Sequence, residues 1–409
     1  MSITISQFEL LRTRFPTWPE LKNHFESEDG VGLRVVEQGD FAVIRYEKGA
    51  STDSIYRSVV WDKATNMPLC VAPFRAKEGV PVQIDVSVED FVDGVMMNAW
   101  VSNGVLQIAT RTRVGGDNTF YSQKTFRKLF EECLATTSLK TIDGLRDSLE
   151  GLRTDVKGTS AFASFVIQHP EHRVVAKVPS PNLYVVHTGY VSSAGVVQIS
   201  ERKIHWPQEL ARLSVYGYMG RRFTTAAEVD DLLLCTAAQH GWRWQGLVFK
   251  DGTGARWRIR TPTYSVLREL RGPESTSLER FFRLRAGRKV SEYLKHYGEE
   301  RQVFWKYEQE LRSSTEDVLK AYTDVHKSHA RVFKDLPEAI RPAVFLLHAK
   351  WRDELRPKGF SVRLQNAIEI VNGLRPFEKK RLLESAKYEA APSQLPGISE
   401  DVTEESTPA

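Results

Sequence analysis

Residues 31–124 carry the pattern that most restricts the fold of this chain. Short runs of alternating apolar and polar residues are separated by Gly, Asp and Asn turns; they read LRVVEQ, FAVIRYE, SVVWD, VQIDVSV, VMMNAWVS and VLQIATRTR. Successive side chains of a strand point to opposite faces, so such alternation is typical of half-buried strands joined by hairpins. The segment is therefore predicted to form antiparallel sheet.

Helical patterns are inserted among further strand patterns. Residues 124–150 have the apolar period of one or two amphipathic helices, and residues 226–240 have that of another. Strand-like runs lie between them (ASFVIQ, RVVAK, LYVVHTGYVS and VVQIS), and GLVFKD and ARWRIRT follow. Helices packed on antiparallel sheets make an α+β core, which we expect over residues 1–272.

After the Arg-Gly-Pro sequence at 271–273 the pattern becomes helical throughout. Thr276 with Glu279, and Ser314 with Asp317, have the spacing of residues that cap the start of a helix. Further helices are predicted over 337–355, 361–374 and 376–388. We expect an all-α domain over 273–390 and a disordered acidic tail over 391–409, where Pro, Ser and acids dominate.

Charge and cysteine content narrow the class of protein. The chain of 409 residues has a net charge of +5; residues 273–390 carry 24 Lys and Arg against 18 Asp and Glu, and the tail carries four acids and no base. The three cysteines are widely scattered, which predicts neither a disulfide framework nor a zinc site. With no apolar run of transmembrane length and no signal-peptide pattern, we expect a cytoplasmic protein without membrane contact.

Six blocks of sequence, taken together in their order and spacing, suggest a relationship to a known protein family. They are YRSVVWD (56–62), VEDFVDG (88–94), QIATRTRVGGDNTFYSQKTFRKL (107–129), ASFVIQHPEHRVV (163–175), WQGLVFKDG (244–252) and WRIRTPTY (257–264). Over residues 35–270 the arrangement resembles the RNA ligase of T-even phages. The resemblance implies a ligase-like nucleotidyltransferase core followed by a helical domain, and a viral or phage protein located in the host cytoplasm.

The resemblance also implies that catalysis has been lost. The family's nucleophilic lysine, in a Lys-x-Asp-Gly motif, corresponds to Phe91, and its ribose- and metal-contacting glutamates correspond to Val166 and Gln245. Phenylalanine has no amine to attack a phosphate, and magnesium prefers carboxylate oxygens. These three degenerate positions predict a pseudoenzyme with no catalytic residue, no metal and no cofactor, although the turn residues Asp93 and Gly94 are retained.

The groups that bind phosphate are retained. The resemblance identifies Arg57 as the nucleotide-contacting arginine and places Arg258 and Arg260 at two phosphate-binding lysines. Alternation along a strand puts Arg256 on the same face as Arg258 and Arg260, and three neighbouring guanidinium groups require anions. Phosphates fit them because a guanidinium binds oxygens in pairs, while ion pairs with Asp or Glu are the alternative.

Two weaker basic patterns extend the predicted RNA-binding site. Arg111 and Arg113 alternate on an earlier strand, and they would line a groove with the other arginines if both strands belonged to one sheet. In the helical region Arg283 and Lys289 share a helix face with other bases, and a solvated face explains that run equally well. The full run is Arg280, Arg283, Arg285, Arg288 and Lys289.

The sequence thus predicts a non-catalytic protein that binds RNA, single-stranded or messenger, in a basic groove with low sequence specificity. One alternative is an active nucleotidyl transferase whose nucleophile has moved to Lys77 or Lys250. Another is a scaffold whose helical domain docks a protein partner.

Overall fold

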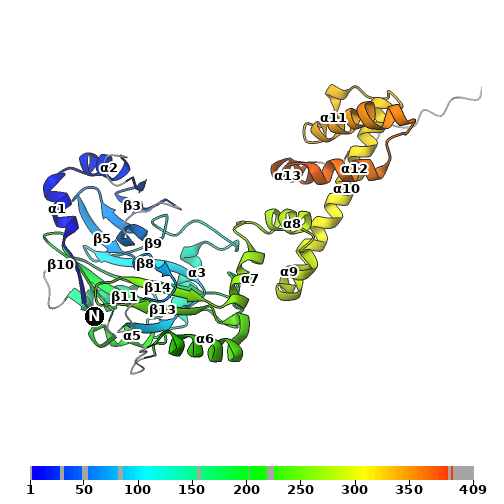
Figure 1. Cartoon of the computed structure of the whole chain (residues 1–409). Coiled ribbons are helices and arrows are strands. Elements are labelled where there is room, and N and C mark those ends of the chain that lie inside the picture. The colour runs from blue at the N-terminus through cyan, green and yellow to red at the C-terminus, as the bar shows by residue number, and fades with distance from the viewer. Residues whose placement is uncertain are drawn as a thin grey trace, which may run out of the picture. The chain divides into compact units, whose positions relative to one another are not determined.

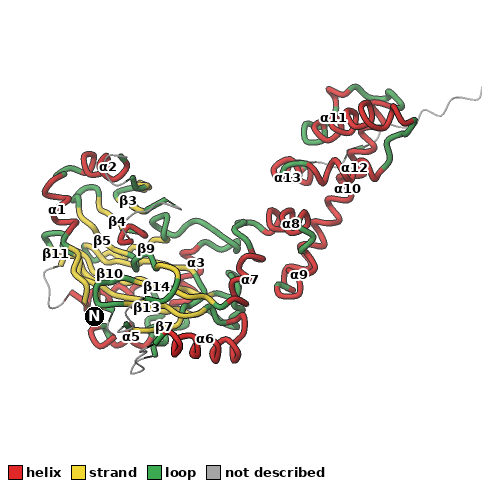
Figure 2. Tube along the Cα trace, viewed as in Figure 1, coloured by secondary structure: helices red, strands yellow, loops and turns green. Residues whose placement is uncertain are grey.

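The computed structural model describes residues 2–27, 32–47, 54–81, 86–153, 158–201, 203–218, 225–385 and 388–389. The chain divides into two compact units, Met1–Ser275 and Thr276–Ala409. Every described strand belongs to the first unit, and the second is built from helices and loops (Figures 1 and 2). The predicted α+β fold followed by an all-α region is confirmed. The predicted limits at 272 and 390 stay predictions, and the predicted tail, 391–409, lies outside the described residues.

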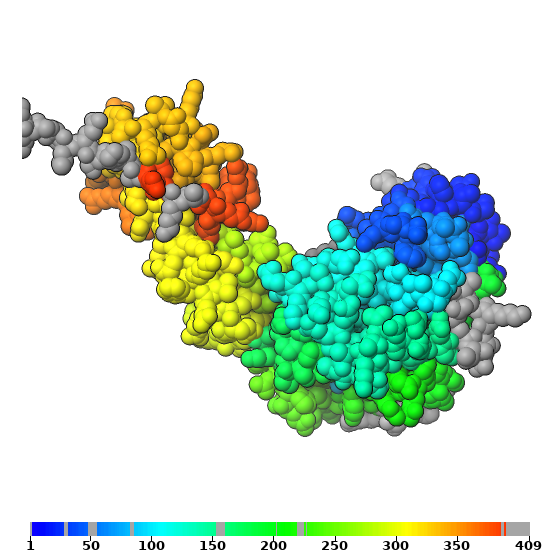
Figure 3. Space-filling view, turned by 180° about the vertical axis from the view of Figure 1, so that it is seen from behind, coloured from blue at the N-terminus to red at the C-terminus, as the bar shows by residue number. Residues whose placement is uncertain are grey.

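The largest sheet has six antiparallel strands. Their spatial order is β1 (Ser2–Ile5), β12 (Val197–Ser200), β11 (Asn182–Ser192), β10 (Gly158–Gln168), β8 (Val95–Ser102) and β9 (Val105–Thr110). Helices α3 (Phe126–Ala135) and α4 (Ile142–Glu150) cover one face, where Phe130 and Leu145 join Phe165 in a buried cluster. Figure 3 shows this covering layer in cyan to teal. The predicted helical segment 124–150 is thus two helices.

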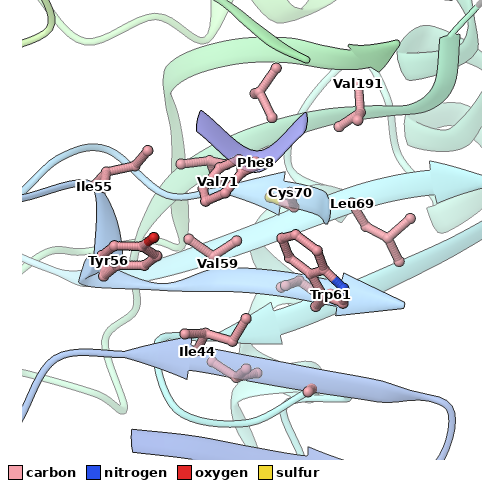
Figure 4. Close-up of a cluster of buried hydrophobic side chains, with 14 of the residues drawn as sticks. Phe8, Ile44, Ile55, Tyr56, Val59, Trp61, Leu69, Cys70, Val71 and Val191 are labelled. Atoms are coloured by element: carbon pink, nitrogen blue, oxygen red, sulfur yellow. The ribbon is translucent and has the colours of Figure 1, made fainter. Parts of the chain in front are cut away.

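A second sheet has the order β2 (Arg34–Gln38), β3 (Phe41–Arg45), β4 (Val59–Asp62) and β5 (Met67–Val71). It packs against the N-terminal helices α1 (Gln7–Arg14) and α2 (Trp18–Glu26) through a buried aromatic group. The ring of Trp61 lies edge-on to Phe8, with centroids 5.7 Å apart, and to Phe25 at 6.0 Å. Figure 4 shows Phe8 and Trp61 among the aliphatic side chains of this core. The sequence patterns did not predict α1, α2, β1 or β5.

The third sheet positions the candidate site. Its order is β6 (Lys77–Glu78), β14 (Arg256–Arg260), β13 (Gly246–Lys250) and β7 (Ser87–Asp90), with β6 parallel to β14 and the other pairs antiparallel. Helix α6 (Ala226–His240) covers one face, because Val229 packs with Leu247 and Phe249 in a common core. The opposite face of the sheet carries the charged side chains described below.

The remaining helices and short turns complete the two units. In the first they are the 3-10 turns Ser54–Arg57, Gly151–Arg153, Lys203–His205 and Gly241–Arg243, and helices α5 (Gln208–Arg212) and α7 (Pro262–Arg271). In the second they are α8 (Ser277–Ala286), α9 (Val290–His296), α10 (Arg301–His326), α11 (Arg341–Lys350), α12 (Leu364–Gly373), α13 (Pro376–Glu384), the 3-10 turns Gly298–Glu300, Phe333–Asp335 and Arg356–Lys358, and a π-turn, Trp351–Leu355.

Two predicted elements are wrong. Thr276 does cap α8, accepting a hydrogen bond from the N–H of Glu279, but Ser314 does not start a helix, because α10 continues through it from Arg301 to His326. The run RVVAK at 173–177 is not a strand. Its N–H groups at Val175 and Ala176 donate to the Asp93 carboxylate, so a side chain, and not a neighbouring strand, satisfies them.

None of the described helices combines the length and the apolar character needed to cross a membrane.

Candidate nucleic-acid interface

Strand β14 separates charged from apolar side chains, as its alternation predicts. Trp257 and Ile259 pack against the core beneath α6, and Arg256, Arg258 and Arg260 point to the other side of the sheet. We call this side the arginine face. Opposite residues on neighbouring strands share a face, so the pairing of β14 with β13 and β7 defines which other residues belong to it.

Three rows of residues cross the arginine face. They are Arg260–Gly246–Phe91, Arg258–Val248–Glu89 and Arg256–Lys250–Ser87. In the first row the Phe91 N–H donates to the Gly246 carbonyl oxygen at 2.8 Å. Gly246 has φ +143°, and a Cβ there would lie 2.0 Å from the Ile259 carbonyl oxygen. The row therefore requires glycine, which leaves no side chain between Phe91 and Arg260.

The Phe91 side chain lies against two of the arginines. The half-buried phenyl ring lies with its centroid 4.9 Å from the guanidinium carbon of Arg260 and 5.9 Å from that of Arg258. At these separations the negative face of the ring attracts the cations. Where the resemblance expects an amine, the arginine face has an aromatic platform that holds two guanidinium groups.

A single carboxylate, Glu78, bridges these two arginines. Arg258 donates to Glu78 Oε1 from Nε at 2.8 Å and from Nη2 at 2.6 Å, and Arg260 donates from Nη1 at 3.2 Å. Partial burial raises the pKa of Glu78, but the hydrogen bonds and charges of the arginines outweigh burial and hold the pKa below its usual value. The Glu78 side chain is 62% exposed, so an incoming anion can compete with it.

The far end of the arginine face is a buried ion cluster. Lys250 is fully buried, and its Nζ lies 2.6 Å from Glu89 Oε2 and 4.0 Å from Glu201 Oε1. Arg256 donates to the same Glu201 oxygen at 3.0 Å. Arg256 thus forms an ion pair with a glutamate, the alternative to phosphate binding named for the three arginines. The predicted contact of Arg256 with phosphate stays a prediction.

Arg57 lies beside this cluster with its charge poorly compensated. It is half-buried, and its Nη1 donates to the Pro73 carbonyl oxygen over a long 3.5 Å. Burial, with repulsion from Arg256, Arg111 and Arg258, lowers the pKa of Arg57 to about 10. Within the described ranges no carboxylate lies within ion-pair distance of its guanidinium. A cation in such surroundings favours the arrival of an anion.

Arg111 and Arg113 differ from their predicted placement. Strand β9 ends at Thr110, so both residues follow the strand in a bend, and β9 belongs to a different sheet from β14. The bend forms because the Thr110 hydroxyl accepts from the N–H groups of Thr112 and Arg113. Arg111 still reaches the neighbourhood of Arg57 and lies over the Tyr46 ring at 5.5 Å, whereas Arg113 is exposed.

Val166 and Gln245, the other two positions predicted to be degenerate, border the segment that follows Phe91. A Cβ on Gly94 would lie 2.7 Å from Val166 Cγ1 and 2.3 Å from the Ile167 carbonyl oxygen, so the segment is pressed against β10. Val166 is half-buried, and Gln245, next to Gly246, is buried. The positions predicted to be degenerate are thus brought to one region by β7, β10 and β13.

Asp93 has a structural role that the sequence did not reveal. Its buried carboxylate accepts from the N–H groups of Val175 and Ala176, at 3.0 and 2.8 Å, and from the Tyr264 hydroxyl at 2.7 Å. Burial and the Asp93 charge raise the pKa of Tyr264, which keeps that hydroxyl protonated as a donor. The sequence had indicated only a turn at Asp93, because these partners are distant in the chain.

Of the basic run in the helical unit, Arg283 is half-buried on α8 and Lys289 is exposed at the start of α9. Arg280 is buried and pairs with Glu300 at 3.1 Å, and Arg285 pairs with Glu308 at 2.8 Å. The predicted RNA contacts of Arg283 and Lys289 stay predictions.

One group of side chains has the composition of a metal site. Glu132, His169 and Glu171 offer ligand atoms within 4.8 Å of one another. The ammonium group of Lys124 already lies 2.9 Å from Glu132 and 2.6 Å from Glu171. His169 Nδ1 accepts from the Glu171 N–H, so Nε2 carries the proton and donates to Glu132 at 2.8 Å. A lysine thus provides the positive charge in this group.

Comparison with known proteins gives matches at the structural level alone. No protein-family model matches the sequence, and no curated protein matches it. Similar solved structures include an archaeal ATP-dependent RNA ligase (14% identity, TM-score 0.37), with 64% of this chain aligned to 66% of that chain, just under two thirds of its length.

Two further structures are a putative ATP-dependent DNA ligase from Aquifex aeolicus (15% identity, TM-score 0.37, 83% of each chain) and an RNA ligase of Naegleria gruberi solved with ATP and manganese (13% identity, TM-score 0.32, 63% of this chain and 82% of that chain). All three TM-scores are below 0.5, so these matches give no information on the substrate or chemistry of this chain. The resemblance to the RNA ligase of T-even phages and the loss of catalysis stay predictions.

Proposed function

We propose that this chain binds the phosphates of single-stranded RNA on its arginine face and does not catalyse nucleotidyl transfer. The observation that carries the proposal is the Phe91 ring packed beneath Arg258 and Arg260, where a ligase would need a lysine. The ring holds two guanidinium groups side by side, and their planar donors match the oxygens of a phosphodiester.

The charge balance of the region supports anion binding. Among the described residues of this region, six basic side chains are set against three carboxylates, a formal excess of three positive charges. Cations of a protein replace counterions at RNA phosphates. The basic residues are Arg57, Arg111, Lys250, Arg256, Arg258 and Arg260, and the acids are Glu78, Glu89 and Glu201.

The two lysines that could replace the missing nucleophile are poorly suited to attack. Lys77 pairs with Trp257 in the sheet register and lies over that ring at 5.8 Å, so it faces away from the arginine face. Lys250 is on the arginine face, but it is fully buried and paired with Glu89. It also lies four residues along β13 from Gly246, roughly 13 Å from the row that contains Phe91.

Metal binding is also disfavoured at the positions where the resemblance expects it. Val166 offers no oxygen ligand, and Gln245 offers one neutral oxygen, whereas magnesium is held by carboxylates and phosphates. The three described glutamates of this region are already paired with cations: Glu89 with Lys250, Glu201 with Arg256, and Glu78 with Arg258 and Arg260. The lack of an amine at position 91 and of carboxylates at positions 166 and 245 supports binding over nucleotidyl transfer.

The proposal predicts RNA affinity that depends strongly on salt and weakly on sequence. If Arg57, Arg258 and Arg260 each neutralise a phosphate, log Kd against log salt should have a slope of about 2, or roughly 20-fold weaker binding between 50 and 200 mM salt. Fluorescence anisotropy with labelled single-stranded RNAs of two unrelated sequences measures this. Absence of binding at 50 mM salt, or an RNA affinity that does not change with salt concentration, would contradict phosphate recognition and favour a protein-docking scaffold.

A further inference from the structure

The helical unit contains an apolar pocket of about 470 Å³ between α8, α9 and α10. Its buried part is formed by Phe281 and Phe304, whose ring centroids are 5.5 Å apart, and the half-buried Leu294 of α9 lines it as well. At its edge Trp305 is 67% exposed. Its indole ring therefore offers a flat aromatic surface next to the pocket, on which a planar group can stack.

The edge of this pocket is positively charged. Arg288 and Arg301 are exposed at it, and among the described residues no carboxylate is paired with either. The one acid of the lining, Glu308, is already neutralised by Arg285 at 2.8 Å and by Arg312 at 3.2 Å. An apolar peptide carries no charge that would complement these cations, whereas a nucleic acid strand carries a phosphate next to every base.

The backbone at Arg288 makes a clean test of its side chain possible. Arg288 has φ +55°, in the left-handed region that favours glycine, although Gly287 immediately before it has an ordinary φ of −80°. This conformation closes helix α8, since the Lys289 N–H donates to the Leu284 carbonyl oxygen at 2.8 Å. Glycine adopts it without strain, so Arg288→Gly would remove the guanidinium group without destabilising the helix end.

We infer that this pocket receives one unpaired base of a single-stranded RNA, stacked on Trp305, while Arg288 and Arg301 hold the flanking phosphates. The inference rests on the proposed RNA-binding function and adds to it a base-contacting site in the helical unit. Stacking on an aromatic ring tolerates any base, so this site adds affinity without sequence preference.

The test compares labelled single-stranded RNA with long-chain inorganic polyphosphate, a polyanion without bases. Trp305→Ala is expected to weaken RNA binding roughly tenfold and to change polyphosphate binding less than twofold. Arg288→Gly should weaken both ligands about threefold while raising the denaturation midpoint, which excludes unfolding as the cause. The matched control is Phe345→Ala, an aromatic residue 64% exposed on α11, which should leave both affinities unchanged.

If Trp305→Ala leaves RNA affinity unchanged, or weakens polyphosphate as much as RNA, the pocket does not hold a base, and a protein partner becomes the better occupant. The double variant Arg258→Glu/Arg260→Glu tests the proposed RNA binding of the arginine face separately from the helical site. If that double variant binds RNA as tightly as the unchanged protein while Trp305→Ala still weakens binding, the proposed function of the arginine face is wrong and the base-binding site in the helical unit is retained.

Discussion

The double variant Arg258→Glu/Arg260→Glu is expected to bind single-stranded RNA about 100-fold more weakly than the unchanged protein at 50 mM salt, equivalent to roughly 2.8 kcal/mol. Two phosphate contacts are lost and two like charges are placed where the strand would lie. The slope of log Kd against log salt should also fall by about 1.4, since each contact with a single strand contributes about 0.7. Anisotropy titrations over a salt series measure both effects.

A matched control changes the same total charge elsewhere on the first unit. Lys77→Glu/Lys128→Glu alters two exposed lysines, one on the opposite face of the sheet and one on α3, and should weaken RNA binding less than threefold. Equal losses in the two double variants would mean that net charge, and not the arginine face, determines affinity.

A third variant, Glu78→Gln, is expected to increase RNA affinity. Glu78→Gln removes the carboxylate that bridges Arg258 and Arg260, so a phosphate no longer has to displace a charged competitor. RNA binding should tighten three- to tenfold, a gain that misfolding cannot imitate. Unchanged or weaker binding by this variant would argue that RNA does not contact these guanidinium groups.

Lys250→Met is expected to lower the free energy of unfolding by about 3 kcal/mol. The ammonium group is buried between Glu89 and Glu201, and its removal leaves buried carboxylates with too little positive charge. Chemical denaturation followed by circular dichroism measures the loss.

The double variant Lys250→Met/Glu89→Gln tests the cause of that loss. With the Glu89 charge removed as well, more than half of the lost stability should return, because the uncompensated charge is the costly feature. If Lys250→Met alone costs less than 0.5 kcal/mol, the cluster is not structural, and a catalytic role for Lys250 gains weight.

Local patterns predicted much of the fold because period and turn signals are local properties. The alternation over 31–124 led to strands, and the segment 226–240 is helix α6 as expected. Strand β5 (MPLCV) was missed because its short apolar run shows no alternation and contains a proline, which is unfavourable within a sheet. The false strand at 173–177 has a strand-like composition, but its N–H groups at Val175 and Ala176 donate to the distant Asp93 carboxylate.

The candidate site was predicted in part for the same reason. Alternation on β14 was enough to place Arg256, Arg258 and Arg260 on one face. It could not reveal that Glu78 and Glu201 would pair with them, since those acids come from segments far away in the sequence. The contact between Phe91 and Arg260 likewise depends on a glycine in the intervening strand, which only the sheet register discloses.

The most direct measurement is covalent labelling with ATP or GTP carrying a labelled α-phosphate, in the presence of magnesium or manganese, followed by denaturation. We predict no retained label on the unchanged protein and none on Lys77→Ala, under conditions in which the same preparation binds RNA. Label that survives denaturation, and that disappears when Lys250 or Lys77 is replaced, would contradict a binding protein that has lost its nucleophile.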